Sequence, residues 1–476
     1  MNSTTSENIE SHNHRHDPNR FAVIPTPQRL QAGTERTGKG VTIAFIDSGF
    51  YPHADLTKPL NRILAYVDVS KPDSQDLQQL DAEPHDWDWH GTQISIAAAG
   101  NEHLSDGVYR GLASDARVVL IKASDRGKIP EANIARGIKW AIANKERYNI
   151  RIISISLGGD EDVSYEQNEV DQAAEEAIRQ GIIVVAAAGN SGCTDRHLTV
   201  PPANSPSVIT VGGYDDKNRL NSRDLELYCS SFGLTADGIF KPEIIAPAMW
   251  VAAPILPGTA LYRQAEALSR LANATDYELP NLAKELRHEA RLPEALMANS
   301  PDSIRAAVET MLRDNKIVAT HYQHVDGTSF AAPIVASIIA LMLEANPNLS
   351  PSLVKQILIA TADRISNRPV GRQGYGAVNA KRAIEAARRE QHVHQSNHFM
   401  PPRVAGGKLI FLYIIMTKHT RFIWPAISTA GTPTKRASSG KQMEFGGRIF
   451  LLRRPDAIIT DSSSMASAGS TIRATA

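Results

Sequence analysis

Short apolar runs alternate with amphipathic stretches over most of the chain. Apolar residues recur every three or four positions in Glu131–Arg147 and Gln167–Gly181, which predicts helices there. Continuous apolar strands separated by helices are typical of a parallel sheet covered on both faces. The pattern therefore predicts an α/β fold, with a three-layer, mostly parallel sheet and helices on both faces. The expected strands are Val41–Asp47, Val118–Ala123, Ile150–Gly159, Ile182–Asn190 and Val208–Tyr214.

Three regions depart from this alternation. Residues 1–40 precede the first strand and are interpreted as a partly disordered N-terminal extension. Residues 261–317 are rich in Ala, Leu, Glu and Arg, which predicts a helical insertion. Its ends are tied to the strand at Ile244 and to the helical stretch at Ser329, so we expect it near the carboxyl edge of the sheet. Residues 392–476 contain 11 Lys and Arg against three Asp and Glu, and they are interpreted as a basic, poorly ordered tail.

Composition narrows the class of protein. The chain has 476 residues, 42% of them hydrophobic and 21% charged, with no net charge, which is typical of a globular protein without a nucleic-acid partner. Cys193 and Cys229 allow one bridge but no disulfide framework. The first residues lack a secretory signal, and no run reaches the roughly 18 apolar residues that span a bilayer. We expect a cytoplasmic location, with export by another route and the oligomeric state left open.

Four polar residues stand at the ends of predicted elements. Asp47 and Asn190 each close a strand, while His90 and Ser329 each open a helical stretch. Taken singly, they fit a turn, a strand end and two helix starts, and Ser329 with Pro333 resembles a helix N-cap followed by a first-turn proline. Ser329 at a helix N-terminus also fits a nucleophile, because that position stabilises an anion.

Together the four residues form the set that acyl transfer requires. A serine hydroxyl needs a base to remove its proton, and histidine titrates near neutral pH. A buried carboxylate orients the imidazole, and an amide donor stabilises the oxyanion. The chain order Asp, His, Ser is the order of subtilisin and differs from that of chymotrypsin or the α/β-hydrolases.

The surrounding motifs carry a specific resemblance. Asp47-Ser48-Gly49, His90-Gly91-Thr92, Ser156-Leu157-Gly158-Gly159, Ala188-Gly189-Asn190 and Gly327-Thr328-Ser329-Phe330-Ala331-Ala332-Pro333 follow one another in this order. In this the chain resembles the subtilisin-like serine proteases, the subtilase family, from Val41 to about Ala387. The resemblance implies a peptidase domain over residues 41–391.

The resemblance also implies roles for individual residues. Asp47 would orient His90, the general base, while Ser329 attacks and Asn190 contributes to the oxyanion hole. Ser156, Leu157, Gly158 and Gly159 would line the first specificity pocket and pair with an extended peptide.

A peptide or protein substrate is implied, without a required cofactor. Calcium, common in the family, stays possible but unassigned, and no metal ligand is assigned. Two alternatives remain: a peptide-maturing transpeptidase or macrocyclase on the same fold, and an inactive relative that binds peptides.

Overall fold

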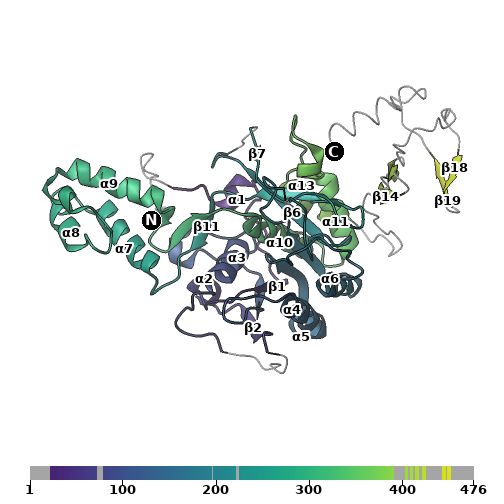
Figure 1. The fold of residues 1–476 in the computed structure, drawn as a ribbon, viewed down its shortest axis with the longest axis horizontal. Coiled ribbons are helices and arrows are strands. Elements are labelled where there is room, and N and C mark those ends of the chain that lie inside the picture. Colours follow the sequence, from purple (N-terminus) through teal and green to yellow (C-terminus); the bar gives the residue numbers. More distant parts are fainter. Residues whose placement is uncertain are drawn as a thin grey trace, which may run out of the picture.

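The computed structural model describes residues 22–71, 79–195, 197–220 and 224–390, together with short strands nearer the C-terminus. Figure 1 shows a central sheet body, with a group of helices extending from one side of it. The predicted tail lies largely outside the described residues. Within it, three antiparallel pairs are described: β14 (Arg403–Ala405) with β15 (Lys408–Ile410), β16 (Tyr413–Met416) with β17 (Arg421–Trp424), and β18 (Gln442–Phe445) with β19 (Arg448–Leu451).

One large sheet forms the middle layer. Its strand order is β10-β6-β5-β4-β1-β3-β2, every pair along this path is parallel, and β7 adds to β6 in the antiparallel sense. The strands are β1 (Thr42–Asp47), β2 (Ile63–Asp68), β3 (Arg117–Lys122), β4 (Ile150–Ile155), β5 (Ile183–Ala187), β6 (Ile209–Asp215), β7 (Glu226–Leu227) and β10 (Ile244–Pro247).

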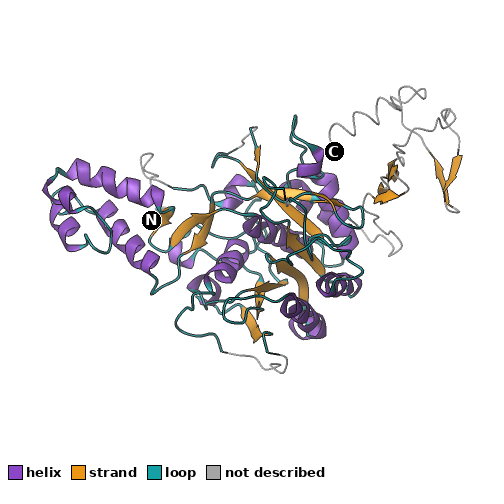
Figure 2. Cartoon of the chain, viewed as in Figure 1, coloured by secondary structure: helices purple, strands orange, loops and turns teal. Residues whose placement is uncertain are grey.

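Helices cover both faces of this sheet (Figure 2). α4 (Glu131–Ala143) and α6 (Glu169–Arg179) pack together over one face, and their apolar residues share a core with Ala44, Ile46 and Ile153. The other face holds α3 (Trp89–Ala99), α10 (Thr328–Ala345), α11 (Pro351–Thr361) and α13 (Ala380–Arg389). The three-layer α/β architecture predicted from the sequence is therefore confirmed.

The structure shortens two of the predicted strands. β4 stops at Ile155, and β5 stops at Ala187, so the polar ends of both apolar runs leave the sheet. Gly189 has φ +98°, a conformation that glycine adopts readily, and it turns the chain out of the sheet. Both exits lie at the carboxyl edge, where side chains from several strands can meet.

Helix α10 is the only helix among the described residues that is long and apolar enough to cross a membrane. The sequence predicted a helical stretch opening near Ser329, and the structure confirms it. In the structure 83% of the span is buried, and α10 packs against β4, β5, β6 and β10. Its hydrophobicity thus reflects a place in the core.

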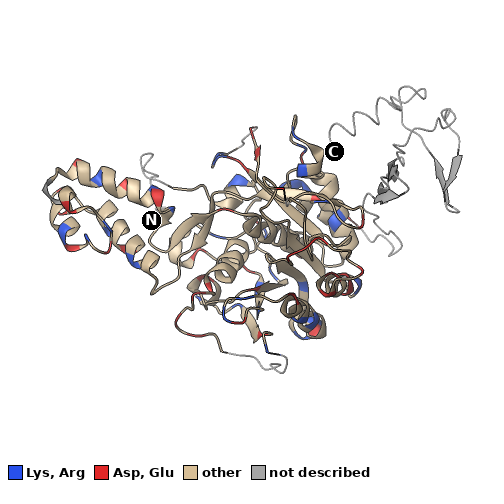
Figure 3. Ribbon diagram, viewed as in Figure 1, with Lys and Arg blue, Asp and Glu red and all other residues tan. Residues whose placement is uncertain are grey.

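The region interpreted as a helical insertion contains α7 (Ala260–Asn273), α8 (Leu279–Glu285), the 3-10 helix η2 (Glu294–Ala298) and α9 (Pro301–Asp314). These helices pack around an apolar cluster of their own, which includes Leu268, Leu271 and Val308. Both acidic and basic residues lie along these helices (Figure 3). A small sheet, β11 (Val251–Pro254), β13 (Tyr322–Val325) and β12 (Ile317–Ala319), joins them to the body.

Part of the predicted N-terminal extension packs on the sheet body. Residues 22–40 include α1 (Thr26–Arg29), while residues 1–21 lie outside the described residues. Arg29 donates to Asp216 and to two backbone carbonyls near β11. Farther on, Glu344 of α10 accepts from the backbone N–H groups of Thr37 and Gly38. Specific polar contacts thus hold this segment in place.

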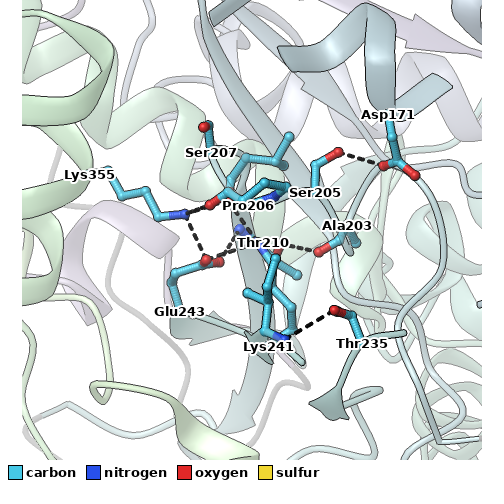
Figure 4. Close-up of polar contacts among 12 residues, drawn as sticks. Asp171, Ala203, Ser205, Pro206, Ser207, Thr210, Thr235, Lys241, Glu243 and Lys355 are labelled. Atoms are coloured by element: carbon cyan, nitrogen blue, oxygen red, sulfur yellow. Dashed lines mark hydrogen bonds and ion pairs between the residues drawn. The ribbon is translucent and has the colours of Figure 1, made fainter. Parts of the chain in front are cut away.

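A buried ionic cluster fixes the β10 edge of the sheet (Figure 4). Oε1 of Glu243 lies 2.8 Å from Nζ of Lys241 and 2.7 Å from Nζ of Lys355, and its Oε2 accepts from the backbone N–H of Thr210. Lys355 also donates to the Val208 carbonyl. Burial lowers the pKa of Lys355 to about 8. The cluster connects α11 to β6 and β10, which carry no predicted catalytic residue.

The remaining elements are short. They are the helices α2 (Ala54–Thr57), α5 (Lys145–Tyr148) and α12 (Val370–Gln373), the 3-10 helix η1 (His103–Ser105), and the paired strands β8 (Gly233–Leu234) and β9 (Phe240–Lys241).

Candidate active site

The structure brings Asp47 and His90 into direct contact. Asp47 ends β1 and its side chain is fully buried, whereas the His90 side chain on the first turn of α3 is 19% exposed. Nδ1 of His90 lies 2.8 Å from Oδ1 and 3.0 Å from Oδ2 of Asp47. A carboxylate only accepts hydrogen bonds, so Nδ1 carries the hydrogen and Nε2 presents its lone pair.

Neighbouring residues fix the positions of Asp47 and His90 relative to each other. Oδ1 of Asp47 also accepts from the backbone N–H of Ser48 at 2.7 Å. A Cβ on Gly91 would lie 2.2 Å from the Gly49 carbonyl oxygen, so only glycine lets the α3 start approach the β1 end this closely. Burial lowers the pKa of His90, but the charge of Asp47 and its hydrogen bond outweigh burial, and the net effect raises the pKa above its usual value.

Ser329 lies on the first turn of α10, beside the other two segments. The ring of the next residue, Phe330, has its centroid 6.1 Å from that of His90. On the other side, Oδ1 of Asn190 accepts from the backbone N–H and from Oγ1 of Thr328, both at 2.9 Å. With its oxygen engaged in this way, the Asn190 amide keeps its N–H groups for another acceptor.

Ser156 has a role that the sequence interpretation missed. Pro333 stands four residues after Ser329 and has no N–H, so the Ser329 carbonyl lacks its usual helical donor. Oγ of Ser156 donates to this carbonyl oxygen at 2.8 Å. Ser156 was expected to contact substrate, and the structure connects its side chain to the turn that carries Ser329. The signal for this contact was the spacing of Ser329 and Pro333.

The rest of the predicted substrate loop follows β4 as an irregular segment. The Gly159 N–H donates to the Pro201 carbonyl at 2.8 Å, whereas Gly158 is exposed and Leu157 half-buried. A Cβ on Gly158 would lie 2.9 Å from Cγ2 of Val200, so the loop packs closely on its neighbour. Its role in binding substrate stays a prediction.

The two cysteines form the single bridge that the sequence allowed. Cys193 and Cys229 are disulfide-bonded, with their Cα atoms 5.2 Å apart. Oxidising surroundings preserve such bonds, whereas the sequence favoured the cytoplasm, and that location stays a prediction.

No group of three or more His, Cys, Asp or Glu side chains within the described residues is arranged to hold a metal ion. Calcium stays possible but unassigned, and independence from a required cofactor stays a prediction.

Comparisons with known proteins agree with the motifs. Residues 38–376 match the profile of the subtilase family. Serine protease AprX of Bacillus subtilis (strain 168) is 32% identical over 363 residues, which cover 75% of this chain and 68% of that protein. The major intracellular serine protease of the same organism is 31% identical over 201 residues, covering 41% of this chain and 57% of that protein.

A solved protease structure from Pseudoalteromonas arctica shares the architecture. It superposes with a TM-score of 0.51 at 22% sequence identity. The match covers 78% of this chain and 96% of that one, and it supports the fold. The family match supplies the activity: the chain belongs to the subtilase family and is a serine-type endopeptidase.

Proposed function

We propose that the chain hydrolyses internal peptide bonds of peptides or proteins through an acyl-enzyme on Ser329. Nε2 of His90 takes the proton of the Ser329 hydroxyl as its oxygen attacks the scissile carbonyl carbon. The same proton then passes to the leaving amine, and water, activated by His90, releases the acyl group. The observation that carries this proposal is the double contact of His90 Nδ1 with buried Asp47.

The oxyanion of each tetrahedral intermediate needs fixed donors. Asn190 supports this role because Thr328 holds its amide oxygen from two directions. The N-terminus of α10 supplies backbone N–H groups beside it, at the positive end of the helix dipole. Donors that are fixed before substrate arrives are the condition for electrostatic stabilisation of a transition state, and this supports the proposed role of both sources.

The central test replaces Ser329 with alanine. We expect kcat on a chromogenic peptide to fall by at least about 1000-fold. Ser337→Ala is the matched control, because Ser337 lies on the same helix and its hydroxyl donates to the Ile334 carbonyl within it. A serine-reactive phosphonate should label Ser329 alone in the folded enzyme. Substantial activity in Ser329→Ala, or labelling of another residue, would refute the assignment.

Asn190→Ala tests the oxyanion hole separately. We expect kcat to fall by roughly 100- to 1000-fold with little change in KM, a magnitude established on subtilisin, a member of this same family. An unchanged kcat would remove Asn190 from the mechanism. Mass spectrometry of the products formed with an added amine shows whether water or the amine accepts the acyl group from Ser329. Products in which the amine is joined to the peptide would identify the enzyme as a transpeptidase instead of a hydrolase.

A further inference from the structure

The disulfide lies on the segment that carries Asn190. Cys193 follows Asn190 by three residues, and its partner Cys229 is 36 residues farther along the chain. Neither sulfur belongs to the proposed catalytic set, and the motifs that identify the family do not include them.

The backbone around Asn190 rests directly on the segment after Cys229. The Gly192 N–H donates to the Cys229 carbonyl at 2.9 Å, and the Ser231 N–H donates to the Gly189 carbonyl at 2.9 Å. A Cβ on Gly192 would lie only 1.8 Å from the Ser230 carbonyl oxygen, so the two backbones are in close contact. The disulfide closes this contact at its outer end.

The segment after Cys229 is in turn fixed to the sheet. Oγ of Ser230 accepts from the Gly213 N–H of β6 at 2.6 Å, and the Tyr228 N–H donates to the Gly213 carbonyl at 3.0 Å. It therefore forms a rigid support. Thr328 holds the Asn190 side chain and accepts from the Gly189 N–H, and the Ser191 N–H on the other side of Asn190 donates to Oγ of Ser231 in this support.

The bridge is open to solvent. Cys193, Thr194 and Asp195 are exposed, and Cys229 is half-buried. A dissolved thiolate can therefore approach the disulfide, and exposed disulfides are the ones that exchange most readily.

We propose that the Cys193–Cys229 disulfide positions Asn190 in the oxyanion hole and makes catalysis responsive to thiols. A thiolate attacks one sulfur and forms a mixed disulfide. The second thiol of a dithiol reagent then releases it, so the enzyme gains two electrons and two protons as two thiols and the reagent becomes a cyclic disulfide. A disulfide oxidant such as oxidised glutathione reverses the change. This inference rests on the proposed role of Asn190.

Kinetics on the folded enzyme test the proposal. Dithiothreitol should lower kcat by about 3-fold or more with KM changed by less than about 2-fold, since a misplaced oxyanion donor weakens only the transition state. Oxidised glutathione should restore kcat. The double variant Cys193→Ser/Cys229→Ser should have the lower kcat of the reduced enzyme, and dithiothreitol should not change it further. Phosphonate titration counts active sites, and mass spectrometry verifies two free thiols.

Reduction of the disulfide in an Asn190→Ala enzyme separates an effect on the position of Asn190 from a general effect on the fold. There dithiothreitol should leave the residual kcat unchanged, because the group that the bridge positions is gone. An equal fall in both backgrounds would overturn the proposal, as would an unchanged kcat in fully reduced wild-type enzyme. Failure of the proposed role of Asn190 would give a different result: the Asn190→Ala enzyme would then have full activity in the oxidised state.

Discussion

Replacing Arg29 with methionine should destabilise the whole catalytic domain, although Arg29 lies outside the predicted domain boundary. Its guanidinium has no solvent exposure and makes three contacts. Nε donates to Oδ2 of Asp216 at 2.7 Å, and the terminal nitrogens donate to the carbonyls of Trp250 at 2.7 Å and Met249 at 2.8 Å. Methionine keeps much of the apolar stem but provides no donor.

The size of the stability loss follows from the Asp216 carboxylate that the substitution leaves unpaired. The Asp216 side chain is 6% exposed, so the substitution leaves a buried carboxylate without its cation. Breaking one side of a buried pair costs about 3–5 kcal/mol. Asp216 still accepts from the Asn218 N–H at 3.0 Å, which places our expectation near the lower end, at about 3 kcal/mol. Arg29→Met/Asp216→Asn should recover part of this loss, because no unpaired charge remains.

The assay is urea unfolding followed by tryptophan fluorescence, in a Ser329→Ala background that prevents self-cleavage. Lys39→Met is the matched control, since Lys39 is exposed in the same N-terminal segment. The free energy of unfolding should drop for Arg29→Met and stay within about 0.5 kcal/mol for the control. Equal effects of the two substitutions would refute the reasoning that residues 22–40 are anchored through Arg29.

Three further predictions concern the site and the pH response. Ser156→Ala should lower kcat by about 5- to 10-fold in peptide assays, because the Ser329 carbonyl loses its donor, whereas Ser154→Ala, two residues earlier on β4, should not. The acidic limb of the kcat/KM profile should have its midpoint above about pH 6.5, since the pKa of His90 is raised and only the neutral base accepts a proton; a midpoint below about pH 6 would contradict this. Burial lowers the pKa of His53 to about 4, so stability should fall by up to about 3 kcal/mol between about pH 6.5 and about pH 4, where only the unfolded chain binds the proton. His53→Gln should flatten that slope in urea titrations at both pH values.

The apolar runs and the short motifs carried most of what the sequence could predict. Runs of β-branched residues specify buried strands by composition alone, and the order of the motifs places Asp47 and His90 at the same sheet edge. The strand β2 was missed because its run, Ile63–Asp68, is short and half-buried, with no helical pattern beside it to mark a repeating unit.

Contacts between segments far apart in the chain could not be predicted from the sequence. Arg29 and Asp216 are 187 positions apart, and nothing in either neighbourhood indicates the other. Composition allowed one cysteine bridge but could not show that it would form beside Asn190. Such pairings depend on how the packed sheet brings loops together, which local pattern does not encode.

The nucleophile turn illustrates why catalytic geometry belongs to the assembled fold. Ser329 lies on the first turn of α10, and its carbonyl lacks a helical donor because Pro333 has no N–H, so its position is fixed from outside the helix. Ser156 holds its carbonyl, and Asn190 holds the preceding Thr328. Two residues earlier again, Asp326 accepts from the Trp250 N–H and pairs with Lys316, at the end of the insertion. These tethers come from four different parts of the chain, so a change in any one of them should alter kcat before it alters the fold.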